Sequence, residues 1–134
     1  MIGVIEFPVR TTKRVEMVEI TPTINNICKE RGVNEGLCCI FVPHTTCGIM
    51  VNEHADPSVV HDIAGTLEKL IPFEADYRHT EGNSAAHIKA ALTGVSLTIP
   101  VSGGRLLLGT WQGVFLCEFD GPRQRRVCLK ICKC

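Results

Sequence analysis

The chain has 134 residues, of which 45% are hydrophobic and 21% are charged, and this composition predicts one globular domain over residues 1–134. Fourteen basic residues balance fourteen acidic ones, so no overall field attracts a nucleic acid or an anionic membrane. No apolar run approaches the roughly 18 residues that a membrane span needs. The first residues lack the pattern of a secretion signal, and we therefore expect a cytoplasmic protein without a membrane partner.

Eight cysteines are many for a chain of this length. Because we expect a reducing compartment and no C-x-x-C spacing occurs, the sequence favours free thiols over a disulfide framework or a zinc knuckle. Cys38 and Cys39 lie in an apolar run and are predicted to be small buried side chains. On an extended strand, the cysteines of residues 128–134 share one face, which fits either free thiols or a site for a soft metal.

The first third of the chain predicts two strands followed by a helix. Loose alternation over the first twenty residues indicates two strands near a sheet edge, with a bend around residues 8–13. Thr21 followed by Pro22 predicts a helix with a threonine cap, and Gly32 ends it.

Two further strands and a second helix follow. Residues 36–42 and 48–52 are interpreted as paired strands joined through residues 43–46. Asp56 followed by Pro57 predicts a helix that stops before Pro72. Its apolar residues recur at helical spacing and predict a stripe facing the core, formed by Val60, Ile63, Ala64, Leu67 and Leu70.

The last part of the chain changes from helix to strand. After an irregular stretch over residues 73–82, Asn83 or Ser84 predicts the start of a short helix that runs through Leu92 and is closed by Gly94. Four strand-like runs with short loops then predict an antiparallel meander over residues 96–101, 105–108, 111–119 and 126–131. We therefore expect an α+β fold with two to three helices covering one face of the sheet.

All five histidines lie between His44 and His87. His44 follows a predicted strand beside a proline, where a side chain is presented either for ligand binding or for a bond to the local backbone. Glu53 comes at the end of another predicted strand and is a candidate to point into the cavity that this strand end borders. Asp56 is explained equally well as a helix cap. His54 and His61 are interpreted as facing solvent.

His79, Asn83 and His87 are spaced by four residues, so Asn83 and His87 share a helix face and His79 is delivered from the preceding loop. Two imidazoles with a nearby carboxylate suit a divalent metal or proton transfer near neutral pH. The alternative is a capped helix with a polar face toward water. Lys89 is expected to point away from His87.

The C-terminal run from Arg123 onward is basic and contains no acid. An arginine that faces a cleft suits a phosphate or carboxylate, so Arg123 and Arg126 are candidates for binding substrate phosphate. The glycine-containing segments Gly103-Gly104-Arg105 and Gly109-Thr110-Trp111-Gln112 do not match a P-loop, and we expect no nucleotide cofactor. Trp111, the only tryptophan, is interpreted as a packing anchor.

Several short segments together resemble the YjbQ-like family, uncharacterised protein family 0047. In chain order they are His44-Thr45-Thr46, Asn52-Glu53-x-Ala55-Asp56-Pro57, Tyr77-Arg78-His79, Glu81-Gly82-Asn83, Ala86-His87-Ile88-Lys89, Gly104-Arg105-Leu106 and Gly109-Thr110-Trp111-Gln112. Two features depart from the family pattern: His54 stands where relatives commonly have asparagine, and the C-terminal cysteines are not a family feature.

The resemblance implies an α+β sandwich-like fold, a homotrimer and a thiamine-phosphate synthase activity, which joins a hydroxymethylpyrimidine diphosphate to a thiazole phosphate. With the candidate residues, it predicts a polar pocket for a small phosphorylated metabolite, with His44, Glu53, His79 and His87 as catalytic residues. Asn83, Arg123 and Arg126 are predicted to bind substrate, and His44, His79 and His87 to hold a divalent metal, zinc or magnesium. A metal- or anion-binding module and a metal-dependent hydrolase are the alternatives.

Overall fold

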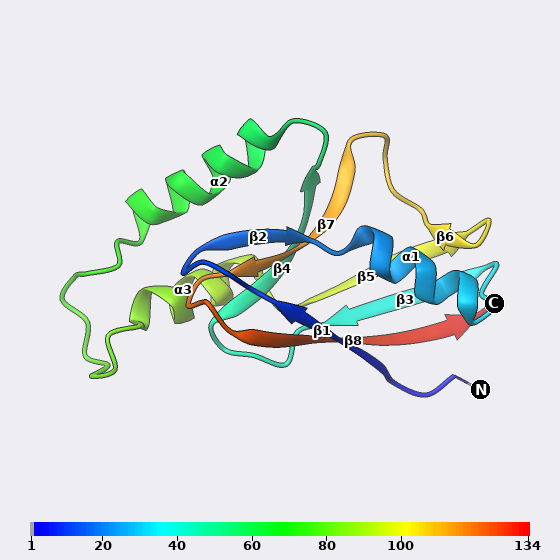
Figure 1. Ribbon diagram of the computed structural model, residues 1–134, viewed down its shortest axis with the longest axis horizontal. Helices are drawn as coiled ribbons and strands as arrows, with labels where there is room; N and C mark the ends of the chain where they lie inside the picture. The colour runs from blue at the N-terminus through cyan, green and yellow to red at the C-terminus, as the bar shows by residue number, and fades with distance from the viewer. Residues whose placement is uncertain (1) are drawn as a thin grey trace.

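The computed structural model describes residues 2–134, which form three helices and eight strands (Figure 1). In chain order these are β1 Ile5–Arg10, β2 Glu16–Glu19, α1 Thr21–Glu30, β3 Gly36–Phe41, β4 Cys47–Glu53, α2 Pro57–Leu70, α3 Ser84–Thr93, β5 Ser96–Ser102, β6 Arg105–Leu106, β7 Gln112–Glu118 and β8 Gln124–Lys133. The α+β class expected from the sequence is confirmed. No helix within residues 2–134 is both long and apolar enough to cross a membrane.

The strands form two antiparallel sheets, a five-stranded one in the order β1-β8-β3-β5-β6 and a three-stranded one in the order β2-β7-β4. The predicted pairing of residues 36–42 with 48–52 is wrong, because β3 pairs with β5 and β8 while β4 pairs with β7. The predicted meander is also wrong beyond the β5–β6 hairpin, since β7 crosses to the other sheet and β8 returns. A short loop has the same residue pattern whether it joins two strands of one sheet or strands of two different sheets, so the sequence does not distinguish the two cases.

The main core lies between the two sheets. Every second residue of β8 from Arg125 to Ile131 points into it, and β7 contributes Val114 and Leu116 from the other side. Helix α1 adds Ile24 and Cys28, both fully buried, and so closes one side of this core. The alternation of buried and exposed residues along each strand is what a two-sheet sandwich requires.

The other face of the three-stranded sheet packs against α3 in a smaller core of Ala86, Ala90, Cys117 and Phe119. Helix α2 contributes only a partly buried Leu67 there, and none of its residues is fully buried. The predicted core stripe on this helix is therefore confirmed only in part: Leu67 contacts the smaller core, whereas Leu70 is 72% exposed. The three helices do not share one face: α1 lies beside β6, whereas α3 packs against β4 (Figure 1).

Local signals at the element ends are confirmed in part. Asp56 caps α2, because its carboxylate accepts the backbone N–H of Ser58 at 2.9 Å. Thr21 does not cap α1 and instead accepts the N–H of Val114 on β7 at 2.8 Å, which ties the helix to the sheet. The bend predicted around residues 8–13 begins only after Arg10, since Pro8 stays within the edge strand β1. Trp111 is 63% exposed, so its interpretation as a packing anchor is wrong.

The eight cysteines are free thiols. Cys38 is fully buried as predicted and Cys39 is half-buried, whereas Cys132 and Cys134 are exposed at the end of the five-stranded sheet. Burial raises the pKa of the Cys38 thiol to about 12, so this thiol is held protonated and acts as a small apolar side chain.

Gly48 of β4 lies where the strand approaches the C-terminal end of α3. A Cβ atom there would meet the hydroxyl oxygen of Thr93 at 2.0 Å and the carbonyl oxygen of Gly94 at 2.7 Å. We expect Gly48→Ala to destabilise the protein by about 1–3 kcal/mol, measured by chemical denaturation, because α3 must shift from the sheet. Gly65→Ala in α2 is the matched control, since its Cβ meets nothing within 4 Å and should stabilise the helix by up to about 1 kcal/mol. Equal effects of the two substitutions would contradict the close approach.

Candidate functional site

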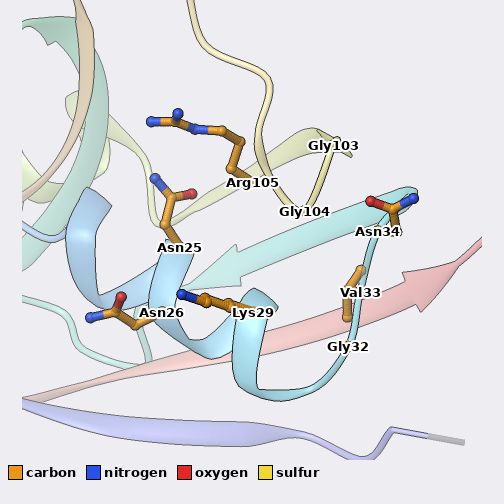
Figure 2. Close-up of a pocket in the computed structure, with 9 residues that line it drawn as sticks. All are labelled: Asn25, Asn26, Lys29, Gly32, Val33, Asn34, Gly103, Gly104 and Arg105. Carbon is orange, nitrogen blue, oxygen red and sulfur yellow. The ribbon is translucent and has the colours of Figure 1, made fainter.

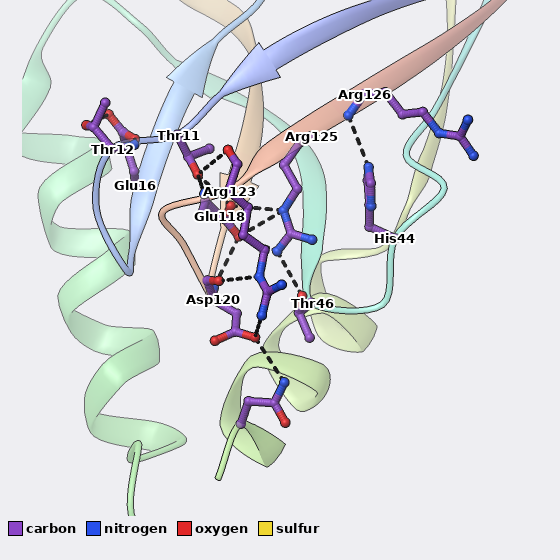
Figure 3. A network of polar contacts seen from close by, with 11 residues as sticks. Thr11, Thr12, Glu16, His44, Thr46, Glu118, Asp120, Arg123, Arg125 and Arg126 are labelled. Atoms are coloured by element: carbon purple, nitrogen blue, oxygen red, sulfur yellow. Dashed lines mark hydrogen bonds and ion pairs between the residues drawn. The ribbon is translucent and has the colours of Figure 1, made fainter. Parts of the chain in front are cut away.

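A buried ion pair closes one end of the main core. Glu118, the last residue of β7, and Arg125, near the start of β8, are 0% and 5% exposed and face each other between the two sheets (Figure 3). Arg125 Nε donates to Glu118 Oε1 at 2.9 Å, and its Nη2 donates to the Thr46 hydroxyl at 2.8 Å. Thr11 donates to the same carboxylate at 2.7 Å. Although burial opposes its charge, these contacts with Glu118 raise the pKa of Arg125 above its ordinary value.

The hydrogen bonds continue outward from this pair to the start of α3. The backbone N–H of Asp120 donates to Glu118 at 3.1 Å, and the Asp120 carboxylate accepts from Asn83 Nδ2 at 2.9 Å and from Arg123 Nη2 at 3.0 Å (Figure 3). The amide oxygen of Asn83 is buried, and no hydrogen-bond partner for it occurs within residues 2–134. This oxygen is therefore an acceptor that the described residues leave unused.

Two histidines adjoin this network. The imidazole rings of His79 and His87 meet edge to face with their centroids 5.3 Å apart. His87 lies one helical turn beyond Asn83 on α3, so its side chain shares the face of Asn83, while His79 comes from the loop before the helix. His79 also lies 3.7 Å from the carboxylate of Glu81. The sequence analysis, which placed His79 in the loop just before the helix that carries His87, is confirmed in that the two rings are close.

His44 occupies the turn between β3 and β4, beside Arg125 and Arg126. Its Nε2 accepts the backbone N–H of Arg126 at 3.1 Å, which is the bond to backbone that the sequence left open as an alternative. Burial, followed by the charge of Arg125, lowers the pKa of His44, so the ring is held neutral. Together with Phe7, Gln124 and Arg126 it borders a groove of about 530 Å³ between β1 and the β3–β4 turn.

We call the polar end the Glu118–Arg125 pair together with the residues that join it directly or through neighbouring residues. It consists of His44, Thr46, His79, Asn83, His87, Glu118, Asp120, Arg123, Arg125 and Arg126.

Glu53 does not lie at the polar end. In the β4–β7 ladder Cys47 is opposite Glu118, whereas Glu53 is opposite Gln112, so Glu53 is at the other end of β4, about 20 Å away along the strand. His54 likewise lies at that other end and pairs with Glu19 at 2.8 Å. His61 is exposed on α2, with 87% of its side chain accessible, as expected.

The predicted metal ligands are not gathered as a set of three. His79 and His87 are neighbours, but His44 is engaged by β8, and residues 2–134 contain no group of three His, Cys, Asp or Glu side chains placed to hold a metal ion. A zinc site ordinarily takes three or four protein ligands. Residues 2–134 therefore offer no zinc site of this kind within one chain.

Sequence reasoning missed the residues that organise the site. Glu118 is a lone acid in the apolar run of β7, and an acid at a core position indicates a buried partner, so this signal was available. Thr11 and Asp120 carry no such signal, because nothing local marks them as neighbours of β7 and α3.

Lys89 is separate from His87 as expected: it is buried and forms an ion pair with Glu68 on α2.

Two packed antiparallel sheets with α3 and a buried ion pair at one end define a small α+β sandwich protein with a polar site at the sheet ends. The model of the family described as UPF0047 protein YjbQ-like matches residues 5–134, nearly the whole chain. A UPF0047 protein from Methanocaldococcus jannaschii is 52% identical over 126 residues, which cover 94% of this chain and 91% of the relative. The chain therefore belongs to the UPF0047 (YjbQ-like) family.

Solved structures agree with this assignment. A YjbQ/UPF0047 family protein from Clostridium acetobutylicum superposes with a TM-score of 0.93 at 48% identity, covering 96% of this chain and 99% of the other. A YbjQ-like protein of unknown function from Sulfolobus solfataricus gives 0.91 at 33% identity, covering 96% of this chain and 95% of its own. The sandwich described above is thus the fold of the family.

We expect Glu118→Gln to destabilise the protein by about 3–5 kcal/mol, because it leaves the buried charge of Arg125 without its counter-ion. Chemical denaturation measures the loss. Glu6→Gln is the matched control, since Glu6 and Arg126 are 51% and 56% exposed and their contact is 3.7 Å, so the change should be within about 1 kcal/mol. A similar small loss for both variants would show that the buried pair contributes nothing special.

The lowered pKa of His44 predicts a loss of stability in acid. The unfolded chain takes up a proton near the ordinary value of 6.5 while the folded ring resists it, so the contribution of His44 is present above that pH and is lost as the pH falls below it. We expect His44→Gln to lose less stability between pH 7 and pH 5 than the native chain does in denaturation experiments. His61→Gln, at an exposed site, should follow the native curve; identical curves for all three proteins would contradict the prediction.

Proposed function

We propose that the polar end binds a small phosphorylated metabolite and catalyses a thiamine-phosphate synthase reaction. In this reaction the ring nitrogen of a thiazole phosphate bonds to the methylene carbon of hydroxymethylpyrimidine diphosphate, the carbon–oxygen bond breaks, and pyrophosphate leaves with the bonding electrons. The resemblance of the chain to its family suggests this chemistry, and the arrangement of the polar end supports it.

The observation that carries the proposal is the buried amide oxygen of Asn83, which has no partner within residues 2–134 and lies one helical turn before His87, whose ring contacts His79. Leaving such an acceptor without a partner costs about 1–3 kcal/mol, which a ligand that donates a hydrogen bond there would recover. An aminopyrimidine ring carries such a donor on its exocyclic nitrogen. Asp120 fixes the amide through Nδ2, so the free oxygen has a defined position.

The difficult step is the departure of pyrophosphate, which requires stabilisation of growing negative charge rather than a strong nucleophile. His79 and His87 supply imidazole N–H donors at the start of α3, where the helix dipole also favours an anion. Arg123 and, from the adjoining groove, Arg126 and His44 are the groups proposed for substrate phosphate. In this scheme His79 and His87 act as proton donors to the leaving group.

A divalent metal, zinc or magnesium, remains a prediction of the sequence. Because residues 2–134 contain no group of three His, Cys, Asp or Glu side chains placed to hold a metal ion, we assign no step to a metal. Metal analysis of protein purified without an affinity tag tests the prediction directly, and the expected absence of a nucleotide cofactor is tested on the same sample by its absorbance.

The alternative is an anion-binding module without catalysis. Arg123 already contacts Asp120 at 3.0 Å and Arg126 lies 3.7 Å from Glu6, so neither guanidinium is without a carboxylate neighbour before a ligand arrives. Shifts of the melting temperature on ligand addition, together with product analysis, distinguish the synthase from the binding module and from a hydrolase. Stabilisation by hydroxymethylpyrimidine diphosphate or thiazole phosphate, with formation of the joined product, supports the synthase. Stabilisation without product supports the module, and release of inorganic phosphate alone supports a hydrolase.

A homotrimer is also proposed, and apolar side chains on α2 support assembly. Val59, Ile63 and Leu67 border a shallow groove of about 410 Å³ on this helix, and Leu70 beyond it is exposed. Apolar patches of this kind are common at subunit contacts. Sedimentation equilibrium measures the mass: a species of three chains supports the trimer, and a monomer at micromolar concentration contradicts it.

We expect His87→Ala to reduce product formation by about 100-fold or more, as is usual when a positioned proton donor is removed. Turnover of the two substrates is followed by chromatography of the product. His61→Ala is the control, because His61 is an exposed histidine on α2 remote from the polar end, and it should keep full turnover. Unchanged turnover of folded His87→Ala would remove His87 from the mechanism.

A further inference from the structure

A second pocket, remote from the polar end, lies between α1, β6 and the loop that leads to β7. Its volume is about 440 Å³, within the range of small-molecule sites. The lining residues are Thr21, Asn25, His54, Ser102, Arg105, Leu106, Leu107, Leu108, Gly109, Thr110 and Gln112, and none of them is acidic. The pocket contains much of the Gly104–Gln112 region, which the function proposed above does not use.

Asn25 presents a hydrogen-bond donor to this pocket. Its side-chain oxygen accepts the backbone N–H of Leu106 at 2.9 Å, which fixes the orientation of the amide because a backbone N–H requires an oxygen. The Nδ2 group therefore points away from β6. Figure 2 shows the Asn25 nitrogen on the side of the Arg105 guanidinium.

His54 borders the same pocket and is held in one orientation. Its Nδ1 contacts the carboxylate of Glu19 at 2.8 Å, so Nδ1 carries the proton and the rest of the ring is left for the pocket. The pair crosses over Gly113 of β7, where a Cβ atom would meet both the Glu19 carboxylate and the His54 Cβ at 2.7 Å. The glycine leaves the space in which the two side chains meet.

Arg105 has no acidic partner: within residues 2–134, no carboxylate lies at ion-pair distance from it, in contrast to Arg123, Arg125 and Arg126. Glu35, the acid that contacts the same hairpin, is engaged by the backbone N–H of Gly103 at 2.8 Å. The guanidinium of Arg105 is thus not neutralised by the protein, and it is available to an anion.

A neighbouring trough of about 510 Å³ extends the site and shares Asn25 and Arg105 with it (Figure 2). Its other lining residues include Lys29, Asn26 and Asn34, and it too has no acid. A ligand held at Arg105 would therefore extend along a surface of amides and one further cation. Such a surface suits a hydroxylated or charged group rather than an apolar one.

We propose that Arg105 and Asn25 bind the phosphate group of a small polar phosphomonoester in this pocket, a site separate from the polar end. Arg105 offers two parallel N–H donors, Asn25 adds a third from α1, and the Thr110 hydroxyl lies on the same lining. The phosphate group of a monoester has three terminal oxygens for these donors, whereas a carboxylate has two. The remainder of the ligand lies in the trough toward Lys29.

The only tryptophan provides a local signal for the test. Trp111 is exposed and lies between Thr110 and Gln112, which both line the pocket. Glycerol 3-phosphate and inorganic phosphate are titrated by calorimetry while Trp111 fluorescence is recorded. We expect saturable binding that changes the fluorescence, and an affinity about tenfold or more lower in Arg105→Gln.

Arg10→Gln is the matched control, because it removes one exposed arginine on β1 outside both sites, and it should bind as the native chain does. Equal weakening by Arg10→Gln would show attraction by overall charge and would overturn the proposal. It would also be overturned if no saturable binding occurred, or if acetate bound as tightly as glycerol 3-phosphate.

Discussion

The Glu118–Arg125 pair is the contact on which the polar end depends. Each sheet contributes one partner, and each partner takes a position in the inward-facing alternation of its strand that would otherwise hold an apolar side chain. The desolvation cost of two charges is met only because Thr11 and Thr46 satisfy further donors and acceptors. The pair therefore sets how the ends of the two sheets meet, and with them the positions of His44, Asp120 and Arg126.

The location of the site follows from this constraint. The β7–β8 connection begins and ends at the ion pair, so Asp120 and Arg123 have little freedom, and Asp120 in turn fixes Asn83 at the start of α3. The close packing of α3 on Gly48 holds the helix from its other end. A binding group placed by such a chain of contacts needs little reorganisation when a ligand arrives, which favours affinity and catalysis.

Sequence reasoning succeeded where the signal is local. The Asp56-Pro57 cap, the glycine that ends each of α1 and α3, and the proximity of His79 to His87 all follow from spacing within one segment. It failed where two segments must be placed together. The assignment of β3 and β4 to different sheets and the separation of Glu53 from the histidines depend on sheet order, which short loops do not encode. The half-buried α2 shows the same limit, since a helical stripe of apolar residues does not reveal what covers it.

The chain has no formal net charge, yet its arginines differ in whether a carboxylate lies beside them. At the polar end Arg123, Arg125 and Arg126 each have a carboxylate neighbour. These ion pairs offset part of the positive charge and so weaken its attraction for an anion. Arg105 lies at the other end of the molecule, where Glu35 and Glu19 are committed to Gly103 and His54. A chain without net charge can therefore hold a local positive region, because the acids near Arg105 are engaged by other groups than its guanidinium. Overall charge excluded long-range attraction of polyanions, but it carries no information about small anions, whose recognition depends on which cations are left unpaired.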